Sequence, residues 1–251
     1  ERYPTLGGTC LNVGCIPSKA LLDSSEHFYN ALNNFNKHGI ETDGVRLNWP
    51  AMLARKDEVV SQTCSGVEYL MKKNKIEVFQ GHGSFISSKE IQITKDNGTK
   101  IQIESDKTII ATGSKPSSIP SVEIDKKRVI TSTEALKLKE IPKKIVVIGG
   151  GIIGLELGSV YSRLGSEVHV VEFLDRLIPS MDGSLGKEML RTLKKQGIKF
   201  FLSHKVQEVK CIRDDVVVSA LNKKNEKVEF EADYCLVAVG RRPFTKGLNL
   251  E

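Results

Sequence analysis

The sequence predicts an α/β protein built from two similar halves. Residues 145–172 run as strand, glycine-rich turn, helix and strand, which is the pattern of a parallel β-sheet unit. Short alternating strands form a meander in each half, and each half closes with an apolar strand, a glycine, a basic residue and a proline. With 39% apolar residues among 251, the chain is long enough for two domains with real cores.

The first half opens with a helix expected over residues 9–33, and two cysteines stand at its start. Cys10 and Cys15 lie in the run GGTCLNVGCIPSK, residues 7–19. In a regular helix, Cα atoms five residues apart are about 8 Å from each other, beyond the ~7 Å limit for a disulfide. A bond between them would need a distorted turn, which Gly14 and Pro17 permit. A thiol near a helix start has a lowered pKa, so Cys15 is the better candidate for a persistent thiolate.

Two other interpretations of this pair stay open: half of a zinc site, or two unrelated buried thiols. The remaining cysteines are widely scattered and have no histidine at ligand spacing, so no metal site is expected. They are Cys64, Cys211 and Cys235.

Further elements of the first half follow from periodicity. A helix over 51–73 places five residues on one face and should pack against the helix 9–33; they are Leu53, Val60, Cys64, Val67 and Met71. Strands are expected over 76–81, 90–94, 100–104 and 107–112, with a hairpin turn at 96–98. Ser and Pro residues over 114–124 indicate the link between the halves.

The second half carries a complete dinucleotide-binding pattern in IVVIGGGIIG and the helix and strand that follow. Gly149, Gly151 and Gly154 permit the tight turn, a close approach of the pyrophosphate and helix–strand packing. Glu172 ends the second strand and can accept hydrogen bonds from ribose hydroxyls, whereas it would repel a 2′-phosphate. We therefore expect NAD(H) rather than NADP(H). The alternative is a glycine-rich turn in a domain that binds no ligand.

The rest of this half reads as a helix near 184–196, a meander over 205–212, 216–221 and 227–231, and an apolar strand within 233–243. We expect a first domain over 1–118, a second over 119–238, and a return to the first over 239–251.

Charge and composition exclude other classes of protein. The formal net charge is +6, but the basic residues are dispersed and none alternate with aromatic residues, so no nucleic-acid surface is expected. No apolar run approaches the ~18–20 residues of a membrane span, and the first residues lack signal-peptide features. Five cysteines, an odd number without a framework spacing, indicate a reducing compartment.

The thirteen residues from Gly7 to Lys19, together with the glycine motif, resemble the flavin-dependent disulfide reductases. The match is to their dihydrolipoamide dehydrogenase branch, because Leu11, Ile16 and Glu172 differ from the glutathione and mercuric reductase pattern. The resemblance covers the whole chain but only the middle of that enzyme. It implies two Rossmann-like dinucleotide-binding domains, one for FAD and one for NAD, each with a β-meander. The N-terminal strand unit and the C-terminal interface domain would be missing.

The resemblance also implies residue roles. Cys10 and Cys15 would form the redox-active disulfide, with Cys10 as the interchange thiol and Cys15 against the flavin. Lys19 would lie near the flavin N5 with Glu156 as its ion-pair partner. FAD contacts would be Glu1, Lys19, Gly83, Thr112, Gly113 and Ser114, and Gly7, Gly8, Thr9 and Cys10 would also lie at the cofactor. NAD contacts would be Gly149, Gly150, Gly151, Ile152, Ile153, Gly154, Glu156, Glu172, Val206 and Gly240.

By the same resemblance, the intact enzyme would oxidise the dihydrolipoyl group of an acyltransferase or of an H-protein carrier. It would act as a homodimer, without nucleic acid or membrane, in bacterial cytoplasm or the mitochondrial matrix. The family's His-Glu acid/base pair lies in the missing domain, so none of His27, His38, His82, His169 and His204 is assigned to catalysis. Two alternatives remain: another flavoprotein disulfide reductase, or, for this chain alone, a nucleotide-binding fragment without turnover.

Overall fold

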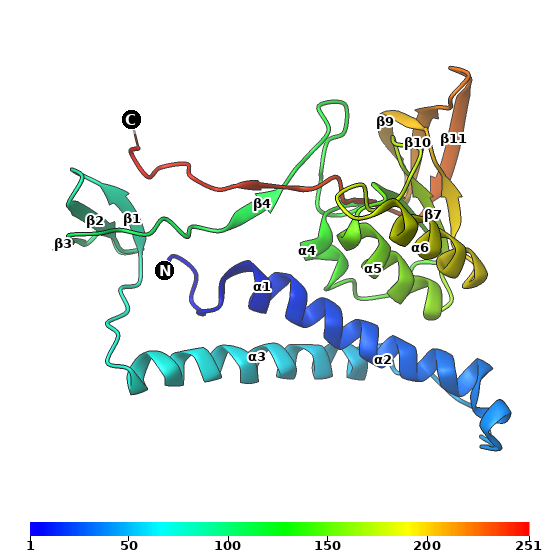
Figure 1. Cartoon of the computed structure of the whole chain (residues 1–251), viewed down its shortest axis with the longest axis horizontal. Coiled ribbons are helices and arrows are strands. Elements are labelled where there is room, and N and C mark those ends of the chain that lie inside the picture. Colours follow the sequence, from blue (N-terminus) through cyan, green and yellow to red (C-terminus); the bar gives the residue numbers. More distant parts are fainter. Residues whose placement is uncertain (251) are drawn as a thin grey trace.

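The computed structural model describes residues 1–250 and has an α/β architecture (Figure 1). Its first half contains α1 (Gly8–Val13), α2 (Cys15–Asn33), the 3-10 helix η1 (Phe35–His38), α3 (Trp49–Lys73), β1 (His82–Phe85), β2 (Glu90–Thr94), β3 (Lys100–Glu104) and β4 (Ser114–Pro116). Its second half contains β5 (Val129–Ile130), α4 (Ser132–Ala135), β6 (Lys144–Ile148), α5 (Ile152–Arg163), β7 (Glu167–Val171), α6 (Gly183–Lys195) and β8 (Lys199–Phe201). The meander β9 (Lys205–Ile212), β10 (Asp215–Leu221) and β11 (Lys227–Ala232) follows, and β12 (Tyr234–Val237) and β13 (Arg241–Pro243) complete the chain.

A parallel five-stranded sheet forms the centre of the second half. Its strand order is β5-β12-β6-β7-β8, and every neighbouring pair is parallel. β6, β7 and β12 are almost continuously apolar because both faces of the sheet are covered. One face packs against α4 and α5, and the other packs against the meander β9–β11. The predicted strand–helix–strand unit and meander are confirmed here.

Two helices of the first half also pack against this core. Leu21 and Trp49 belong to the same buried cluster as the inner residues of α5 and β6. The indole Nε1 of Trp49 donates a hydrogen bond of 2.9 Å to the Leu138 carbonyl. The buried ammonium of Lys56 donates one of 2.9 Å to the Leu136 carbonyl. These contacts fasten α2 and α3 to the second half, and the predicted packing of α2 on α3 is confirmed.

The first helix differs from the prediction, because the single helix expected over 9–33 is broken at Gly14. That residue has φ −134° and ψ −117°, a conformation outside the helical region, and it separates α1 from α2. A Cβ at Gly14 would lie 2.8 Å from the Thr9 carbonyl oxygen, so a larger residue would force the turn to move. The distorted turn that the cysteine spacing required is therefore present.

Two predicted strands of the first half are wrong. The strand expected over 76–81 does not form; this segment is extended and exchanges single hydrogen bonds with Glu1, and β1 begins only at His82. Residues 107–112 form no strand either, and Ile109 is 91% exposed. A strand needs a partner, and no described strand lies beside this segment. Among the described residues of the first half, the expected β-meander is present as β1–β3, with the turn at 96–98, and no parallel sheet forms.

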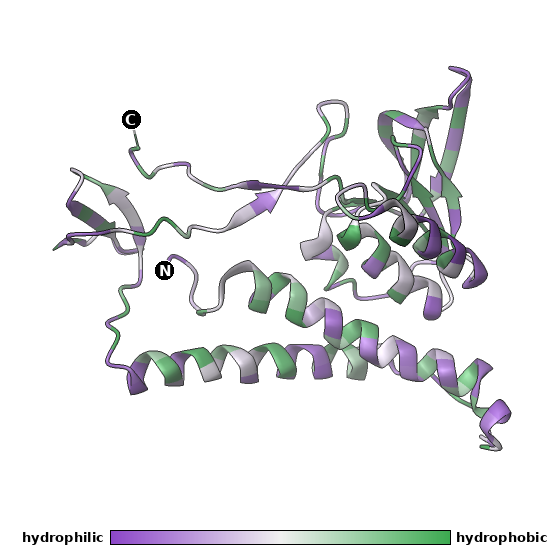
Figure 2. Cartoon of the chain, in the orientation of Figure 1, coloured by the Kyte–Doolittle hydropathy of each residue, from purple (hydrophilic) through white to green (hydrophobic). Residues whose placement is uncertain are grey.

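The chain returns to the first half after β12. β13 pairs antiparallel with β4, joining residues 241–243 to 114–116. Figure 1 shows the β1–β3 meander at the end of the molecule away from the parallel sheet, while α2 and α3 extend beneath both halves. Figure 2 shows α2 and α3 alternating hydrophobic and hydrophilic residues along their lengths. Within residues 1–250, no helix is both long and apolar enough to span a membrane.

Candidate active site

The two cysteines lie on either side of the helix break. Cys10 is on α1, Cys15 is the first residue of α2, and both are exposed free thiols. A side-chain hydrogen bond with Cys15 raises the pKa of the Cys10 thiol, as does desolvation, while the charge of Lys19 opposes the shift. The buried Cys64 thiol of α3 donates a hydrogen bond to Asn12 of α1.

The zinc interpretation gains no support from this geometry. In the described part of the chain, no group of three or more His, Cys, Asp or Glu side chains is placed to hold a metal ion.

An ion pair connects the thiol-bearing helix to the second half. The Lys19 ammonium on α2 lies 2.7 Å from Oε1 of Glu156 on α5, so the structure brings these two predicted residues together. Ser18 was not predicted; its hydroxyl donates to Oε2 of Glu156 at 3.4 Å. The carboxylate of Glu156 is thus held by two neighbouring side chains of α2, one turn beyond Cys15.

The glycine turn between β6 and α5 has the geometry that a pyrophosphate requires. Gly149 has φ 108°, and a Cβ there would lie 2.6 Å from the Ala238 carbonyl oxygen. A Cβ at Gly154 would lie 2.5 Å from the Gly149 oxygen, whereas one at Gly151 would meet no atom within 4 Å. Helix α5 begins after Gly151 without a side-chain cap. Its first N–H groups are therefore free to face an anion.

Glu172, at the end of β7, stabilises this turn by hydrogen bonding. Its side chain is buried; Oε2 accepts a hydrogen bond of 2.5 Å from the Gly150 N–H, and Oε1 accepts one of 2.7 Å from the Leu174 N–H. The predicted ribose-binding acid therefore lies directly at the glycine turn. Of the other predicted contacts here, Ile152 is the exposed first residue of α5, and Ile153 packs on the core.

Some of the predicted flavin contacts of the first half gather around residue 113. The Thr112 hydroxyl donates a hydrogen bond to the Phe244 carbonyl, and the Phe244 N–H donates one to the Gly113 carbonyl. Gly113 has φ 76°, and a Cβ there would lie 3.7 Å from the hydroxyl oxygen of Thr9. Ser114 accepts a hydrogen bond of 2.8 Å from Arg241. The structure thus brings Thr9 beside 112–114.

Other predicted contacts lie elsewhere. Gly7 and Gly8 precede and open α1, and Gly83 lies in β1 opposite Ile93. The Glu1 carboxylate accepts hydrogen bonds from the backbone N–H groups of Arg2 and Tyr3. Val206 is buried on β9, and Gly240 accepts a hydrogen bond from the Ser117 N–H.

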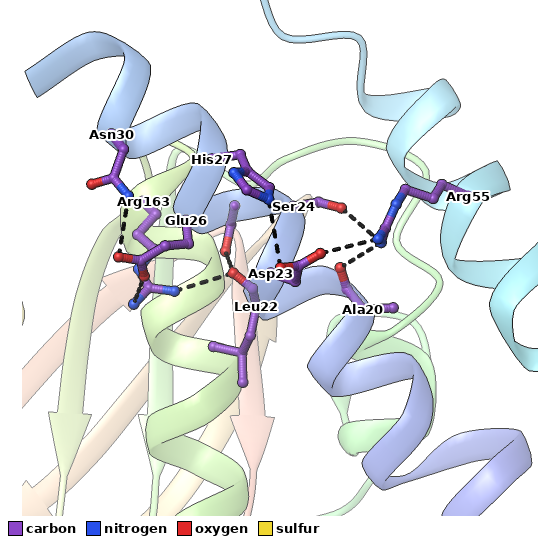
Figure 3. A network of polar contacts seen from close by, with 10 residues as sticks. Ala20, Leu22, Asp23, Ser24, Glu26, His27, Asn30, Arg55 and Arg163 are labelled. Carbon is purple, nitrogen blue, oxygen red and sulfur yellow. Dashed lines mark hydrogen bonds and ion pairs between the residues drawn. The ribbon is translucent and has the colours of Figure 1, made fainter. Parts of the chain in front are cut away.

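The sequence analysis did not predict a set of hydrogen bonds and ion pairs along α2. Figure 3 shows Arg163 of α5 on one side of α2, near Glu26 and Leu22, and Arg55 of α3 on the other, near Asp23 and Ala20. The one available signal was spacing, since Glu26 and Arg163 each follow a predicted ion-pair residue by seven positions.

Comparison with known proteins decides the family. The model of the family described as pyridine nucleotide-disulphide oxidoreductase matches residues 3–251. The chain belongs to this family. Family members with similar sequences include dihydrolipoyl dehydrogenase 1, mitochondrial, of Arabidopsis thaliana, 48% identical over all of this chain and 50% of its own length. The corresponding enzyme of Schizosaccharomyces pombe is 48% identical with the same coverage, and leghemoglobin reductase of Glycine max is 47% identical, with 48% of its length covered.

Solved structures agree with this membership. A copper(II) complex of the HOCl-induced flavoprotein disulfide reductase RclA from Escherichia coli superposes with a TM-score of 0.82 at 27% identity, over 99% of this chain and 52% of that one. LpdA from Mycobacterium tuberculosis has the same fold, with a TM-score of 0.88 at 24% identity over 98% of this chain and 53% of that one. The chain spans about half the length of the curated relatives it matches.

Proposed function

We propose that the protein containing this chain is an NAD-dependent dihydrolipoyl dehydrogenase. The observation that carries the proposal is the broken helix at Gly14, which exposes Cys10 and Cys15 next to the Lys19–Glu156 pair. Relatives with this name share 48% identity over the whole chain, which supports the same assignment.

The residues at both nucleotide positions suit the proposed cofactors. For NAD, the open space at Gly151, the uncapped start of α5 and the buried Glu172 form a cradle for a pyrophosphate and its ribose. For FAD, the contacts proposed within this chain are Thr9 with 112–114, Lys19 at the reacting ring, and more distantly Glu1 and Gly83. Bound FAD would supply two-electron transfer between the thiol pair and NAD⁺.

The thiol pair would supply the first redox step. A thiolate of the dihydrolipoyl group attacks the sulfur of Cys10 in a Cys10–Cys15 disulfide and forms a mixed disulfide, and Cys15 leaves as thiolate. The second dihydrolipoyl thiol then displaces Cys10. The substrate loses two electrons and two protons and becomes a cyclic disulfide; the cysteine pair takes up the two electrons, one proton goes to the displaced Cys10 sulfur, and the other goes to solvent. The charge of Lys19 favours the thiolate form of Cys10 during these reaction steps.

The wider setting of the protein belongs to the same proposal. Its domains would be 1–118 with 239–251 for FAD and 119–238 for NAD; the pairing of β13 with β4 supports the return of the chain. The partner would be a lipoylated acyltransferase or H-protein, and the complete protein a homodimer. Its location would be the mitochondrial matrix or bacterial cytoplasm; relatives from plants and fission yeast are named mitochondrial, which is consistent with the matrix.

The deciding experiment uses the full-length protein. We expect NAD⁺-dependent oxidation of dihydrolipoamide, followed as NADH absorbance, to vanish in Cys10→Ser and to persist in Cys211→Ser, which alters an exposed thiol outside the proposed site. A wild-type protein that reduces glutathione disulfide but not lipoamide would instead favour another flavoprotein disulfide reductase.

A second candidate comes from two relatives named leghemoglobin reductase, each 47% identical to this chain. We therefore propose leghemoglobin reduction as an additional activity to be measured with NADH on the same preparation. Reduction of leghemoglobin faster than of lipoamide would make it the main function.

A further inference from the structure

Two arginines hold helix α2, one from each neighbouring helix (Figure 3). Arg55 of α3 donates to the Ala20 carbonyl at 3.3 Å and pairs with Asp23 at 3.0 Å. Arg163, the last residue of α5, donates to the Leu22 carbonyl at 3.3 Å and pairs with Glu26 at 2.5 Å. Each guanidinium thus contacts α2 at a backbone carbonyl and at a carboxylate three or four residues further on.

An arginine that contacts the helix at two points restricts the movement of that helix more than a single ion pair does. A planar guanidinium bonded to a carbonyl and a carboxylate fixes both the rotation of the helix and its position along its axis. A lysine ammonium is a point charge on a flexible stem and lacks this rigid fork, so it would hold the helix less precisely. The arginines therefore act on the geometry of α2 as well as on its electrostatics.

Arg163 is the more restrictive of the two. Its side chain is 13% exposed, against 49% for Arg55. Its Nε is buried and has no hydrogen-bond partner among the described residues. A guanidinium taken out of water in this way depends on its carboxylate, because removing Glu26 would leave the charge buried without compensation.

The Arg163–Glu26 pair also forms a pattern with the pair nearer the thiols. Lys19 and Glu26 lie seven residues apart on α2, and Glu156 and Arg163 lie seven apart on α5. The order of charges is reversed between the two pairs, since α2 provides the cation in the first and the anion in the second. Two turns of helix advance about 10.5 Å. A shift of α2 by this amount would bring Glu26 toward Glu156, so the two pairs together favour one register.

We propose that Arg163 and Glu26 are positioning residues that set the register of α2 against α5 and so hold Lys19 against Glu156 and near Cys10, which lies on the separate helix α1. The inference rests on the proposed function for its meaning, because it assigns the register to the redox reaction. Neither residue touches the thiols, and their effect is transmitted through the position of Lys19.

The test measures thiol reactivity in the reduced full-length protein. The rate of iodoacetamide alkylation at Cys10 and Cys15 is followed by mass spectrometry at neutral pH. We expect Arg163→Met to slow alkylation of Cys10 about three- to tenfold, because a displaced Lys19 stabilises the thiolate less. Arg163→Lys, which keeps the charge but loses the planar fork of the guanidinium, should give an intermediate rate. Glu26→Gln should slow alkylation at least as much as Arg163→Met.

Two further variants make the test specific. Combining Arg163→Met with Lys19→Met should slow alkylation no more than Lys19→Met alone, because both changes act through Lys19. Arg191→Met removes an exposed arginine–glutamate pair within α6 and should leave the rate unchanged. Wild-type alkylation by a folded Arg163→Met or Arg163→Lys protein would overturn the inference, and so would strictly additive effects in the double variant. Lipoamide turnover is measured separately, so a failure of the proposed function is distinguishable from a failure of the register.

Discussion

The ammonium of Lys19 lies 2.7 Å from the carboxylate of Glu156, although 137 positions separate the two residues in the sequence. Lys19 follows the thiol pair on α2, and Glu156 stands one turn inside the helix that opens at the glycine turn. The contact therefore connects the two predicted sites of the molecule. It keeps a positive charge near Cys10, where the charge opposes the rise in the pKa of that thiol.

The first prediction separates the chemistry of this pair from its contribution to stability. Lys19 is 57% exposed, so Lys19→Met should change the free energy of unfolding by less than about 1 kcal/mol. Lipoamide turnover by the full-length protein should nevertheless fall at least about tenfold, because a charge beside the reacting groups is lost. Thermal melts and steady-state kinetics measure the two effects. Equal turnover in the wild type and in Lys19→Met would show that the pair is structural only.

The second prediction concerns the different roles of the two thiols. In the full-length protein, Cys10→Ser should abolish exchange with lipoamide and leave a thiolate-to-flavin charge-transfer absorbance, whereas Cys15→Ser should remove that absorbance. The reason is position, since Cys15 begins α2 and Cys10 lies on the separate helix α1. Visible spectra and a lipoamide assay of both variants test it. Lipoamide turnover at the wild-type rate in Cys10→Ser would show that Cys10 is not the interchange thiol.

The third prediction concerns the choice of nucleotide. NADH should be strongly preferred to NADPH, and Glu172→Ala should reduce the ratio of the two kcat/KM values at least about tenfold. The same change leaves the Gly150 N–H without its acceptor, which costs about 1–3 kcal/mol of stability. Asp175→Asn, an exposed change on the same loop, serves as the control. Equal kcat/KM for both nucleotides in the wild type would contradict the role of Glu172.

The fourth prediction concerns acid stability. Burial lowers the pKa of His169, which packs against Phe201 and Phe230. The unfolded chain therefore binds a proton near pH 6.5 that the folded chain binds only at lower pH. Stability should fall as the pH drops below about 6.5, and His169→Phe should reduce this loss by up to about 1 kcal/mol at pH 5.5. Urea unfolding at pH 7.5 and 5.5 measures it. Leu193→Ala, which removes packing in the other buried cluster and no titratable group, should keep the wild-type pH dependence.

The parts of the candidate site that depend on one local sequence motif could be predicted from the sequence. The glycine turn, Glu172 and the cysteine spacing depend on residues close together in the chain, and the structure places them as a connected turn, a bracing carboxylate and a broken helix. The pairing of Lys19 with Glu156 came from family resemblance, because no local pattern relates positions so far apart. The contacts of Arg163 were not predicted for the same reason, because its partners Glu26 and Leu22 belong to another helix.

The failed strand predictions have a related physical cause. The segments 76–81 and 107–112 have the alternating or apolar composition of strands, but composition does not provide a neighbouring strand for the ladder. The segments that did form strands, 90–94 and 100–104, are joined by a short turn and provide each other's partner. Local pairing was therefore predictable, and pairing that depends on distant segments was not.

The last prediction concerns the 251-residue chain expressed alone. The segment 107–112 is apolar and joins no sheet, and the residues Ile109 and Ile110 are 91% and 48% exposed. An extended segment of this kind readily pairs with another chain. We expect the chain to self-associate with rising concentration in sedimentation velocity, to bind NADH weakly, and to lack flavin absorbance and lipoamide activity.

Substitution at that segment tests the mechanism of association. Ile109→Lys with Ile110→Lys should shift the chain toward monomer, because two charges would have to be brought into the interface. Ile212→Lys changes another exposed isoleucine, 54% exposed on β9, and should leave association unchanged. Equal effects of both substitutions would indicate nonspecific charge repulsion instead. A yellow, catalytically active 251-residue chain would contradict the inactivity expected here, because it would show that the half of the relatives' length outside this chain is not needed for flavin binding.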